Sequence, residues 1–508
     1  MTRRILMLLL PAALTVLAAD YDQFILTPKP GPAPKINGAA VYGARPGRPF
    51  LYRVPCTGQR PIPFSAGGMP ESLKLDPATG VIAGVAPSKM GDYRITLEAS
   101  NAFGSTKRSF RIVVGDTLAL TPPMGWNDWY THYDRITDSL MRQGAEAMIA
   151  SGMADSGYQY VNIDDCWMIK TGAKDAVLGG EPRDAAGAIR PNGRFPDMRA
   201  LTSYIHSKGL KAGIYTSPGP ETCARFTGSY QHERIDARKM AEWGFDFLKY
   251  DWCGYTRVAG GQALADRKRP YDLMGGILKA LDRDIVFNLC QYGMSDVWKW
   301  GAEVNGNCWR TTGDLGLEKD TRLPAFYSIG FKNAEHWEFA GPGHWNDPDY
   351  ILIGTVGNAF KIDAPPVKTP LTPDEQYSYM SMWALMAAPL FYSGDMNHLD
   401  AFTLNVLTNS DVIDIDQDAL SKQARIIRRT GDEFVLAKPL EDGSLAVGLF
   451  NLSEKRREMS ASWADLGVQG HKRIRDLWRQ KDIGDASDRL TAQVNRHGVA
   501  LVRIAAQP

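Results

Sequence analysis

Short apolar segments that end in polar residues recur through the middle of the chain, and they restrict the folds that it can adopt. These segments are QYVNID (159–164), KAGIYT (211–216), DFLKYD (246–251), IVFNLC (285–290) and NCWRTT (307–312). Stretches with helical periodicity, such as residues 136–152 and 234–244, lie between them. Strand–helix alternation over about 300 residues is typical of an α/β fold of the TIM-barrel type. The sequence therefore predicts a (β/α)8 barrel over residues 118–418.

Short strand patterns separated by turns flank the predicted barrel on both sides. Residues 49–115 alternate apolar and polar side chains between Pro, Gly and Asn turns, which predicts a small β-sandwich. Residues 73–104 resemble the Ig-like modules of secreted bacterial proteins. We favour a packing role for this module over carbohydrate binding, because no aromatic platform is evident in it. Residues 419–508 predict a C-terminal antiparallel β-sandwich, and the Pro-, Gly- and Ala-rich residues 20–48 predict a linker.

The N-terminus has the pattern of a secretory signal peptide. Arg3 and Arg4 precede an apolar run at residues 5–17, and small residues suitable for cleavage follow it. A membrane anchor is the alternative, but the run is short and contains Pro11. We therefore expect residues 1–19 to be a signal peptide, and the mature protein to be periplasmic or secreted with no membrane association.

Charge and cysteine content narrow the possible partners. The formal net charge of +1 gives no electrostatic basis for binding nucleic acid or an acidic membrane. Six cysteines in 508 residues do not make a disulfide scaffold, although an exported chain permits a few bridges. The sequence does not indicate an oligomeric state.

Two predicted strands end in carboxylates. Alternation along the segment 246–251 puts Lys249 and Asp251 on one face of the strand, and Asp314 follows a second strand-like run. A strand-end salt bridge would explain the first pair alone. Two carboxylates at the catalytic end of a barrel are instead what glycoside hydrolysis needs, one to attack the sugar or activate water and one to protonate the leaving oxygen.

Several motifs resemble those of the α-galactosidase (melibiase) family, glycoside hydrolase family 27. They are TPPMGWNDW (121–129), NIDDCW (162–167), GIYTSPGPETC (213–223), FLKYDWC (247–253), WRTTGD (309–314) and AGPGHWNDPD (340–349), and the resemblance extends over residues 118–508. It implies that Asp251 is the nucleophile and Asp314 the general acid/base of a retaining mechanism. It also implies a disulfide between Cys223 and Cys253, and the pair Cys290 and Cys308 has weaker support.

The same resemblance implies a set of sugar-binding residues. They are Trp129, Asp164, Asp165, Tyr215, Cys223, Lys249, Gln291, Arg310 and Asp349. Asp164 and Asp165 would hold the O4 and O6 hydroxyls and so select galactose. Arg310 would lie near O2, or else pair with Asp314. Asp349 stands in a turn-rich segment, so a loop-fixing role is its alternative.

Gln291 and Tyr350 depart from the family pattern. Many members have Glu at the position of Gln291, which contacts the 2-hydroxyl, and relatives that act on N-acetylgalactosamine have small residues there. Gln can bond a hydroxyl without carrying a charge. Met is common in the family where this chain has Tyr350.

The resemblance implies an exported retaining α-galactosidase that removes terminal α-linked galactose from oligosaccharides or polysaccharides. It implies no metal or organic cofactor. Two alternatives within the family are a β-L-arabinopyranosidase and an isomalto-dextranase. A non-catalytic sugar-binding protein is the alternative from another class. Asp251, Asp314, Arg310 and Lys249 together argue against it.

Overall fold

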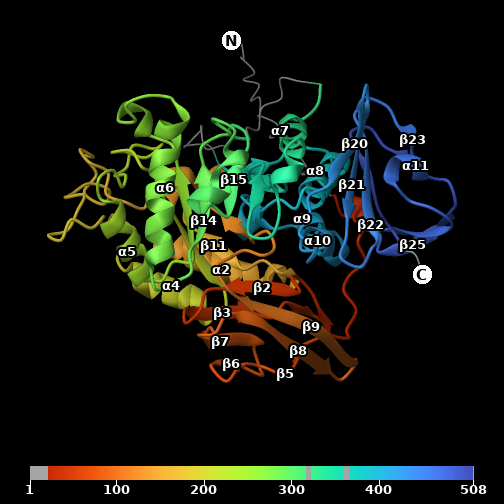
Figure 1. Ribbon diagram of the computed structural model, residues 1–508, viewed down its shortest axis with the longest axis horizontal. Coiled ribbons are helices and arrows are strands. Elements are labelled where there is room, and N and C mark those ends of the chain that lie inside the picture. The colour runs from red at the N-terminus through yellow and green to blue at the C-terminus, as the bar shows by residue number, and fades with distance from the viewer. Residues whose placement is uncertain (1–20, 316–321, 358–364, 507–508) are drawn as a thin grey trace, which may run out of the picture.

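The chain folds into a central barrel with a β-domain at each end of the sequence (Figure 1). The computed structural model describes residues 21–315, 322–357 and 365–506. The predicted signal peptide, residues 1–19, lies outside the described residues. In the described part of the chain, no helix is both long and apolar enough to cross a bilayer.

Eight parallel strands form the barrel, in chain order except that the last strand pairs with the first. They are β10 (Met124–Asn127), β11 (Tyr160–Asn162), β12 (Lys211–Thr216), β13 (Phe247–Asp251), β14 (Val286–Cys290), β15 (Cys308–Arg310), β16 (Trp345–Asp347) and β19 (Leu390–Tyr392). Ile351, just after β16, makes a parallel bridge to Tyr392 of β19 and closes the barrel. The predicted fold class, a TIM barrel between two β-sandwiches, is confirmed.

Helices surround the strands on the outside of the barrel (Figure 1). The helices of this part of the chain are α1 (Trp129–His132), α2 (Asp138–Ala150), α3 (Met153–Ser156), α4 (Met198–Ser207), α5 (Glu233–Trp243), α6 (Leu264–Ala280), α7 (Ala325–Ala334), α8 (Pro373–Leu385), α9 (Ala401–Leu407) and α10 (Ser410–Asp416). Between β14 and β15 the chain forms only two short 3-10 helices, η4 (Val297–Lys299) and η5 (Gly301–Val304), where a regular barrel would have an α-helix.

Helix α8 joins the barrel to the C-terminal domain. A capping box of Thr372 and Glu375 starts it, and all its residues from Glu375 to Leu385 are buried. A helix buried on all sides lies between two packed layers. Gly448 of the C-terminal sheet allows this contact, because a Cβ atom there would lie 2.5 Å from Leu385 Cδ1.

The C-terminal domain is an antiparallel β-sandwich. Its strands are β20 (Arg425–Thr430), β21 (Glu433–Pro439), β22 (Leu445–Asn451), β23 (Arg457–Ser462), β24 (Lys472–Asp476), β25 (Lys481–Ala486), β26 (Arg489–Val494) and β27 (Val499–Ile504), with α11 (Trp463–Leu466) between two of them. Six strands form one sheet, and β23 and β26 form the other. Alternate side chains such as Val447, Leu449 and Val502 fill the core between the sheets.

The N-terminal domain is also a sandwich, of one four-stranded and one three-stranded sheet. Its strands are β2 (Val41–Ala44), β3 (Pro49–Arg53), β5 (Phe64–Gly67), β6 (Leu73–Leu75), β7 (Val81–Val85), β8 (Gly91–Asn101) and β9 (Gly104–Val114), and β1 (Lys35–Ile36) pairs with β4 (Cys56–Thr57). Tyr52 and Phe110 pack in its core with their ring centroids 4.6 Å apart. The linker predicted for residues 20–48 is wrong in part, because β2 pairs with β9 and completes a sheet.

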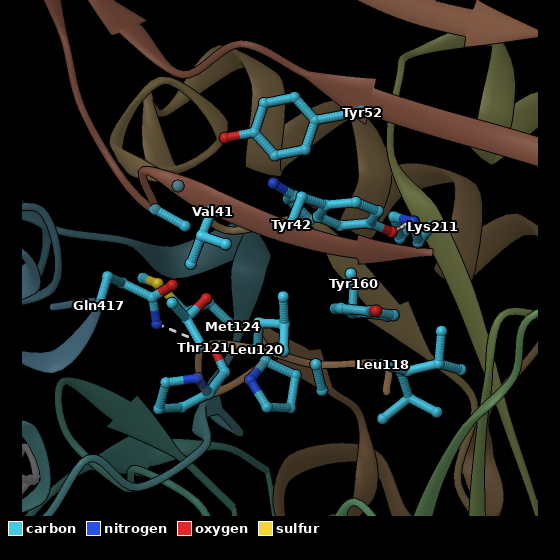
Figure 2. A pocket seen from close by; sticks show the side chains of 18 of the residues that line it. Val41, Tyr42, Tyr52, Leu118, Leu120, Thr121, Met124, Tyr160, Lys211 and Gln417 are labelled. Carbon is cyan, nitrogen blue, oxygen red and sulfur yellow. Dashed lines mark hydrogen bonds between the residues drawn. The ribbon is translucent and has the colours of Figure 1, made fainter. Parts of the chain in front are cut away.

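This N-terminal domain covers the amino-terminal end of the barrel. A cavity of about 60 Å³ between the two is lined by Tyr42 and Tyr52 of the domain and by the first residues of barrel strands, among them Tyr160 and Lys211 (Figure 2). Lys211 Nζ donates a hydrogen bond to the Tyr42 hydroxyl and lies 4.7 Å from the centre of its ring. The domain is therefore docked on the face opposite to the strand ends that carry chemistry.

Arg45 anchors this docking. Its side chain is inserted at the carboxyl end of α6, where Nη1 donates to the Lys279 carbonyl at 2.6 Å and Nη2 donates to the Arg283 carbonyl. Its Nε donates to Asp284 Oδ1 at 2.6 Å. A cation at the last carbonyls of a helix satisfies their free acceptors and complements the helix dipole. Arg45 is only 8% exposed, so the contact belongs to the interior of the molecule.

Candidate active site

Asp251 is the last residue of β13, at the carboxyl end of the barrel, and it is 3% exposed. Its Oδ1 atom accepts hydrogen bonds from the Trp252 backbone amide at 2.7 Å and from the Tyr292 hydroxyl at 2.6 Å. Burial raises the pKa of Asp251, while the Lys249 ammonium and the bond from Tyr292 act in the opposite direction. The carboxylate is therefore held in one orientation in a desolvated site.

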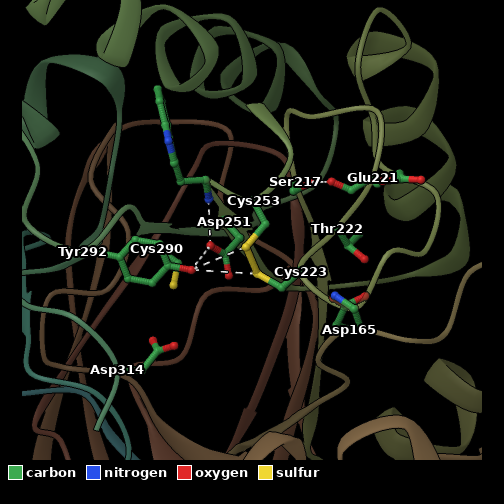
Figure 3. The surroundings of a disulfide bond; sticks show 12 residues. Asp165, Ser217, Glu221, Thr222, Cys223, Asp251, Cys253, Cys290, Tyr292 and Asp314 are labelled. Atoms are coloured by element: carbon green, nitrogen blue, oxygen red, sulfur yellow. Dashed lines mark hydrogen bonds between the residues drawn. A yellow bond between two sulfur atoms is a disulfide. The ribbon is translucent and has the colours of Figure 1, made fainter. Parts of the chain in front are cut away.

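Asp314 follows β15, two strands along the barrel from β13. Its side chain is 42% exposed, and Arg310 Nη2 lies 3.2 Å from its Oδ1. Figure 3 shows Asp251 and Asp314 in one region, with the Tyr292 ring reaching its hydroxyl to Asp251. The two carboxyl groups therefore differ in their access to solvent.

Asp164 accepts three side-chain hydrogen bonds at one carboxylate oxygen. Its Oδ2 accepts from Lys249 Nζ at 2.8 Å, Asn127 Nδ2 at 2.9 Å and the Tyr350 hydroxyl at 3.2 Å. Burial disfavours the charge on Lys249, but the neighbouring Asp164 carboxylate holds the pKa of that ammonium well above its ordinary value. The pair is a buried ion pair with its geometry fixed by neighbouring groups.

Asp165, the residue after Asp164, accepts hydrogen bonds from two backbone amides. Its Oδ1 accepts from the Cys166 amide at 2.7 Å and its Oδ2 from the Ala224 amide at 2.9 Å. Burial raises the pKa of Asp165 to about 7. Strand β11 ends at Asn162, so the two acidic residues follow the strand, and Asp165 fixes the loop that carries Cys223.

Arg310 joins Asp314 to a second carboxylate. Its Nη2 lies 3.0 Å from Asp349 Oδ2, which also accepts from the Tyr130 hydroxyl at 2.7 Å and the Leu315 amide at 2.8 Å. Asp349 has a φ of +87°, a left-handed conformation that is uncommon for residues other than glycine. These contacts correspond to the loop-fixing alternative for Asp349, which here holds Arg310 in place.

Gln291 carries an acceptor with no partner. Its Nε2 donates to the Met294 carbonyl at 3.1 Å, but its Oε1 is buried and accepts no hydrogen bond within the described parts of the chain. An unsatisfied buried acceptor is costly, so a donor from a bound ligand would be favourable here.

Three aromatic rings lie close to the Lys249 ammonium. Its Nζ atom lies 5.9 Å from the ring centre of Trp129, 5.3 Å from that of Tyr215 and 5.2 Å from that of Tyr350. Trp129 begins α1 and is partly exposed, so one face can contact a ligand.

The disulfide between Cys223 and Cys253 ties the loop after β12 to the end of β13. Tyr215 donates from its hydroxyl to Cys223 Sγ at 3.3 Å. In the described residues the cysteines at positions 56, 166, 290 and 308 are buried and free. Cys290 and Cys308 are not bridged, because the strand register puts Cys308 beside Asn288, two residues before Cys290.

The described residues contain one group of three possible metal ligands, Cys223, Asp251 and Cys253, with atoms within 4.8 Å of one another. The two sulfur atoms are bonded to each other in the disulfide, so they are not thiolate ligands. The group therefore does not offer three ligands to a metal ion.

Sequence reasoning missed three polar contacts of the site. Tyr292 bonds Asp251, Tyr130 bonds Asp349, and Asp128 accepts from the Asp164 amide at 2.8 Å. Asp128 and Tyr130 stand in and next to a motif at the end of the first barrel strand, so their place in the chain was a usable signal. Tyr292 follows Gln291 directly, and nothing in its sequence context distinguishes it from a packing residue.

A barrel with two carboxylates at its strand ends, a buried lysine–aspartate pair and an arginine defines a glycoside hydrolase. The family description "Alpha galactosidase A" matches residues 121–418, the "Alpha galactosidase C-terminal beta sandwich domain" matches residues 430–504, and an Ig domain matches residues 33–115. The chain belongs to the α-galactosidase (melibiase) family, glycoside hydrolase family 27.

Known proteins are similar to this chain over most of its length. The α-galactosidase of Cyamopsis tetragonoloba is 37% identical over 392 residues, which are 76% of this chain and 87% of the relative. A solved Bacteroides fragilis structure, assigned to the α-galactosidase/melibiase class, has a TM-score of 0.85 and 34% identity and covers 96% of this chain and 100% of its own. A β-L-arabinopyranosidase of Geobacillus stearothermophilus has a TM-score of 0.66 and 25% identity, covering 76% of this chain and 97% of its own.

Proposed function

We propose that this protein is an exported retaining α-galactosidase that removes terminal α-linked galactose from oligosaccharides or polysaccharides. The observation that carries the proposal is the buried Asp251, with two donors fixed on one carboxylate oxygen, together with the exposed Asp314. The relatives named α-galactosidases support the choice of sugar. Export rests on residues 1–19 as a signal peptide.

The mechanism is a double displacement. Asp251 attacks the anomeric carbon and forms a covalent ester as the glycosidic bond breaks, and Asp314 gives its proton to the leaving oxygen. Asp314, now a carboxylate, takes a proton from water as the water oxygen attacks the same carbon. The ester bond breaks in the same step, and its electron pair returns to Asp251. Asp314 ends protonated again.

Sugar recognition follows from the partners of each side chain. Lys249 holds the Asp164 carboxylate in place. Three donors already bond its Oδ2, so Oδ1, which accepts from one backbone amide, would accept from the sugar hydroxyls. The unpaired Oε1 of Gln291 would accept a hydrogen bond from the 2-hydroxyl. Trp129 would pack on the apolar edge of the ring, where aromatic faces bind sugars without hydrogen bonds.

A β-L-arabinopyranosidase is the second candidate, and Tyr350 favours it. The Tyr350 hydroxyl lies 3.2 Å from Asp164 Oδ2, on the carboxylate proposed to hold O4 and O6. A bulky side chain there narrows the space for a hydroxymethyl group, which an arabinopyranoside lacks. The short Asp164 argues for the galactoside, because a longer acid would crowd that group further.

A panel of chromogenic glycosides tests this proposal. We expect the α-galactoside to be the best substrate, the β-L-arabinopyranoside second and the α-N-acetylgalactosaminide last. Loss of one hydroxyl partner costs about 1–3 kcal/mol, so the first gap in kcat/KM should be about 10-fold or more. A preference for the arabinoside would move the function to the second candidate. Comparable turnover of the N-acetylated substrate would refute the role of Gln291, and an isomaltoside preference would refute both candidates.

A further inference from the structure

Tyr292 makes the shortest side-chain contact with the proposed nucleophile. Its hydroxyl lies 2.6 Å from Asp251 Oδ1, and the Trp252 amide donates to the same oxygen at 2.7 Å. Bonds from neutral donors to a carboxylate are shorter and stronger than bonds between neutral groups. Because both donors hold Oδ1, the other oxygen, Oδ2, is left to attack the sugar.

The ring of Tyr292 is fixed from several sides. Its backbone has a φ of +62°, which is rare for an aromatic residue and persists only where the surroundings enforce it. At the next residue, Gly293, a Cβ atom would lie 2.3 Å from the Thr311 carbonyl oxygen, so the loop lies directly against the segment after β15. The Arg310 guanidinium lies 5.9 Å from the centre of the Tyr292 ring.

The disulfide bounds the hydroxyl on a further side. The Tyr292 oxygen is 3.7 Å from Cys253 Sγ and 3.8 Å from Cys223 Sγ (Figure 3). The strained loop, Arg310 and the disulfide together hold the Tyr292 hydroxyl against Asp251 Oδ1. A side chain that only filled space would not need this arrangement.

We propose that Tyr292 is a positioning residue that holds Oδ1 of Asp251 and stabilises this carboxylate as it leaves the sugar. The proposal rests on the proposed function, in which Asp251 is the nucleophile. In the first step Oδ2 forms a bond to the anomeric carbon, and negative charge on the carboxylate falls. In the second step that bond breaks, its electron pair returns to the carboxylate, and the charge at Oδ1 rises.

A donor on Oδ1 stabilises the charged carboxylate more than the ester. It therefore favours the transition state of the second step, in which charge returns, more than that of the first step, in which charge is lost. Removal of the hydroxyl should slow breakdown of the glycosyl-enzyme more than its formation. A residue with a merely structural role would affect both steps alike.

The pH dependence of kcat/KM gives a second measure of the hydrogen bond between Tyr292 and Asp251. Asp251 must be ionised to attack, so activity is lost as the pH falls through its pKa. The hydrogen bond from Tyr292 lowers that pKa against the effect of burial, and its loss should move the acid limb of kcat/KM to higher pH. The other titratable groups that face Asp251 from the surrounding elements stay unchanged: Lys249, Tyr215, Tyr271, Cys290 and Asp314.

The test is Tyr292→Phe, which keeps the ring and its contact with Arg310. With a dinitrophenyl α-galactoside, we expect a burst of dinitrophenolate followed by a steady-state rate about 10- to 100-fold below that of the wild type, the effect of one bond to a charged group. KM should fall together with kcat. The acid limb of kcat/KM should move to higher pH.

Tyr271→Phe is the matched control. Tyr271 of α6 is fully buried, and its hydroxyl has no hydrogen-bond partner within the described parts of the chain. It lies against Trp252, the residue after the nucleophile, with stacked rings 6.4 Å apart. This variant should keep the wild-type steady-state rate and acid limb.

Two results would overturn the proposal. One is a Tyr292→Phe enzyme with the wild-type steady-state rate and acid limb. The other is an equal loss in both chemical steps with an unchanged acid limb, which would mean that Tyr292 only supports the loop. Retained activity of an Asp251→Asn variant would instead contradict the proposed function, and that measurement does not involve Tyr292.

Discussion

Asp251→Asn should abolish turnover and leave the fold intact. The amide cannot attack the anomeric carbon, and loss of a nucleophile should raise the barrier by several kcal/mol, which is about 10³-fold or more in rate. The amide fills the same volume as the carboxylate, and the Trp252 amide can still donate to its oxygen. Steady-state hydrolysis of an aryl α-galactoside measures the loss, and circular dichroism checks the fold.

Asp272→Asn provides the control for this substitution. Asp272 lies exposed on α6, outside the site, so the same chemical change should leave activity at the wild-type level. If a folded Asp251→Asn enzyme kept a tenth of wild-type activity, which corresponds to a barrier change of about 1.4 kcal/mol, the assignment of the nucleophile would be wrong.

Asp314→Ala should separate substrates by their leaving groups. A natural galactoside leaves as a poor alkoxide and needs a proton, so its kcat/KM should fall about 10²- to 10⁴-fold. A dinitrophenyl galactoside has a good leaving group, so its first step should lose far less. The side chain is 42% exposed, so its removal opens no buried cavity.

The Asp251→Asn enzyme is the comparison for this second prediction, because loss of the nucleophile should affect both substrates severely. The ratio of kcat/KM for the two substrates is therefore the quantity to measure. Equal losses for both substrates in Asp314→Ala would mean that Asp314 binds the sugar or supports the loop.

The barrel could be predicted because its strands carry their own signal. Strand β13 begins with the apolar Phe247 and Leu248 on opposite faces and ends in Asp251, which marks both a buried strand and its carboxyl end. The absence of an α-helix between β14 and β15 could not be predicted. Local sequence propensity does not tell two short 3-10 helices from one α-helix.

Much of the site depends on contacts between distant segments, which a single sequence does not contain. Asp165 bonds the amide of Ala224, 59 residues away. Tyr292 bonds Asp251 across 41 residues. The linker prediction failed for the same reason, because β2 is a strand through its pairing with β9, about 70 residues away in sequence. The ends of the strands could therefore be predicted as the place of the site, but the contacts among its side chains could not.

The anomeric form of the first product is the most direct test of the central claim, a two-step mechanism on Asp251. Proton NMR during hydrolysis of an α-galactoside distinguishes the two anomers before they equilibrate. Two displacements at the same carbon retain the configuration, so we expect α-galactose to be formed first. If β-galactose were the first product, the reaction would be a single displacement by water, and Asp251 would not be a nucleophile.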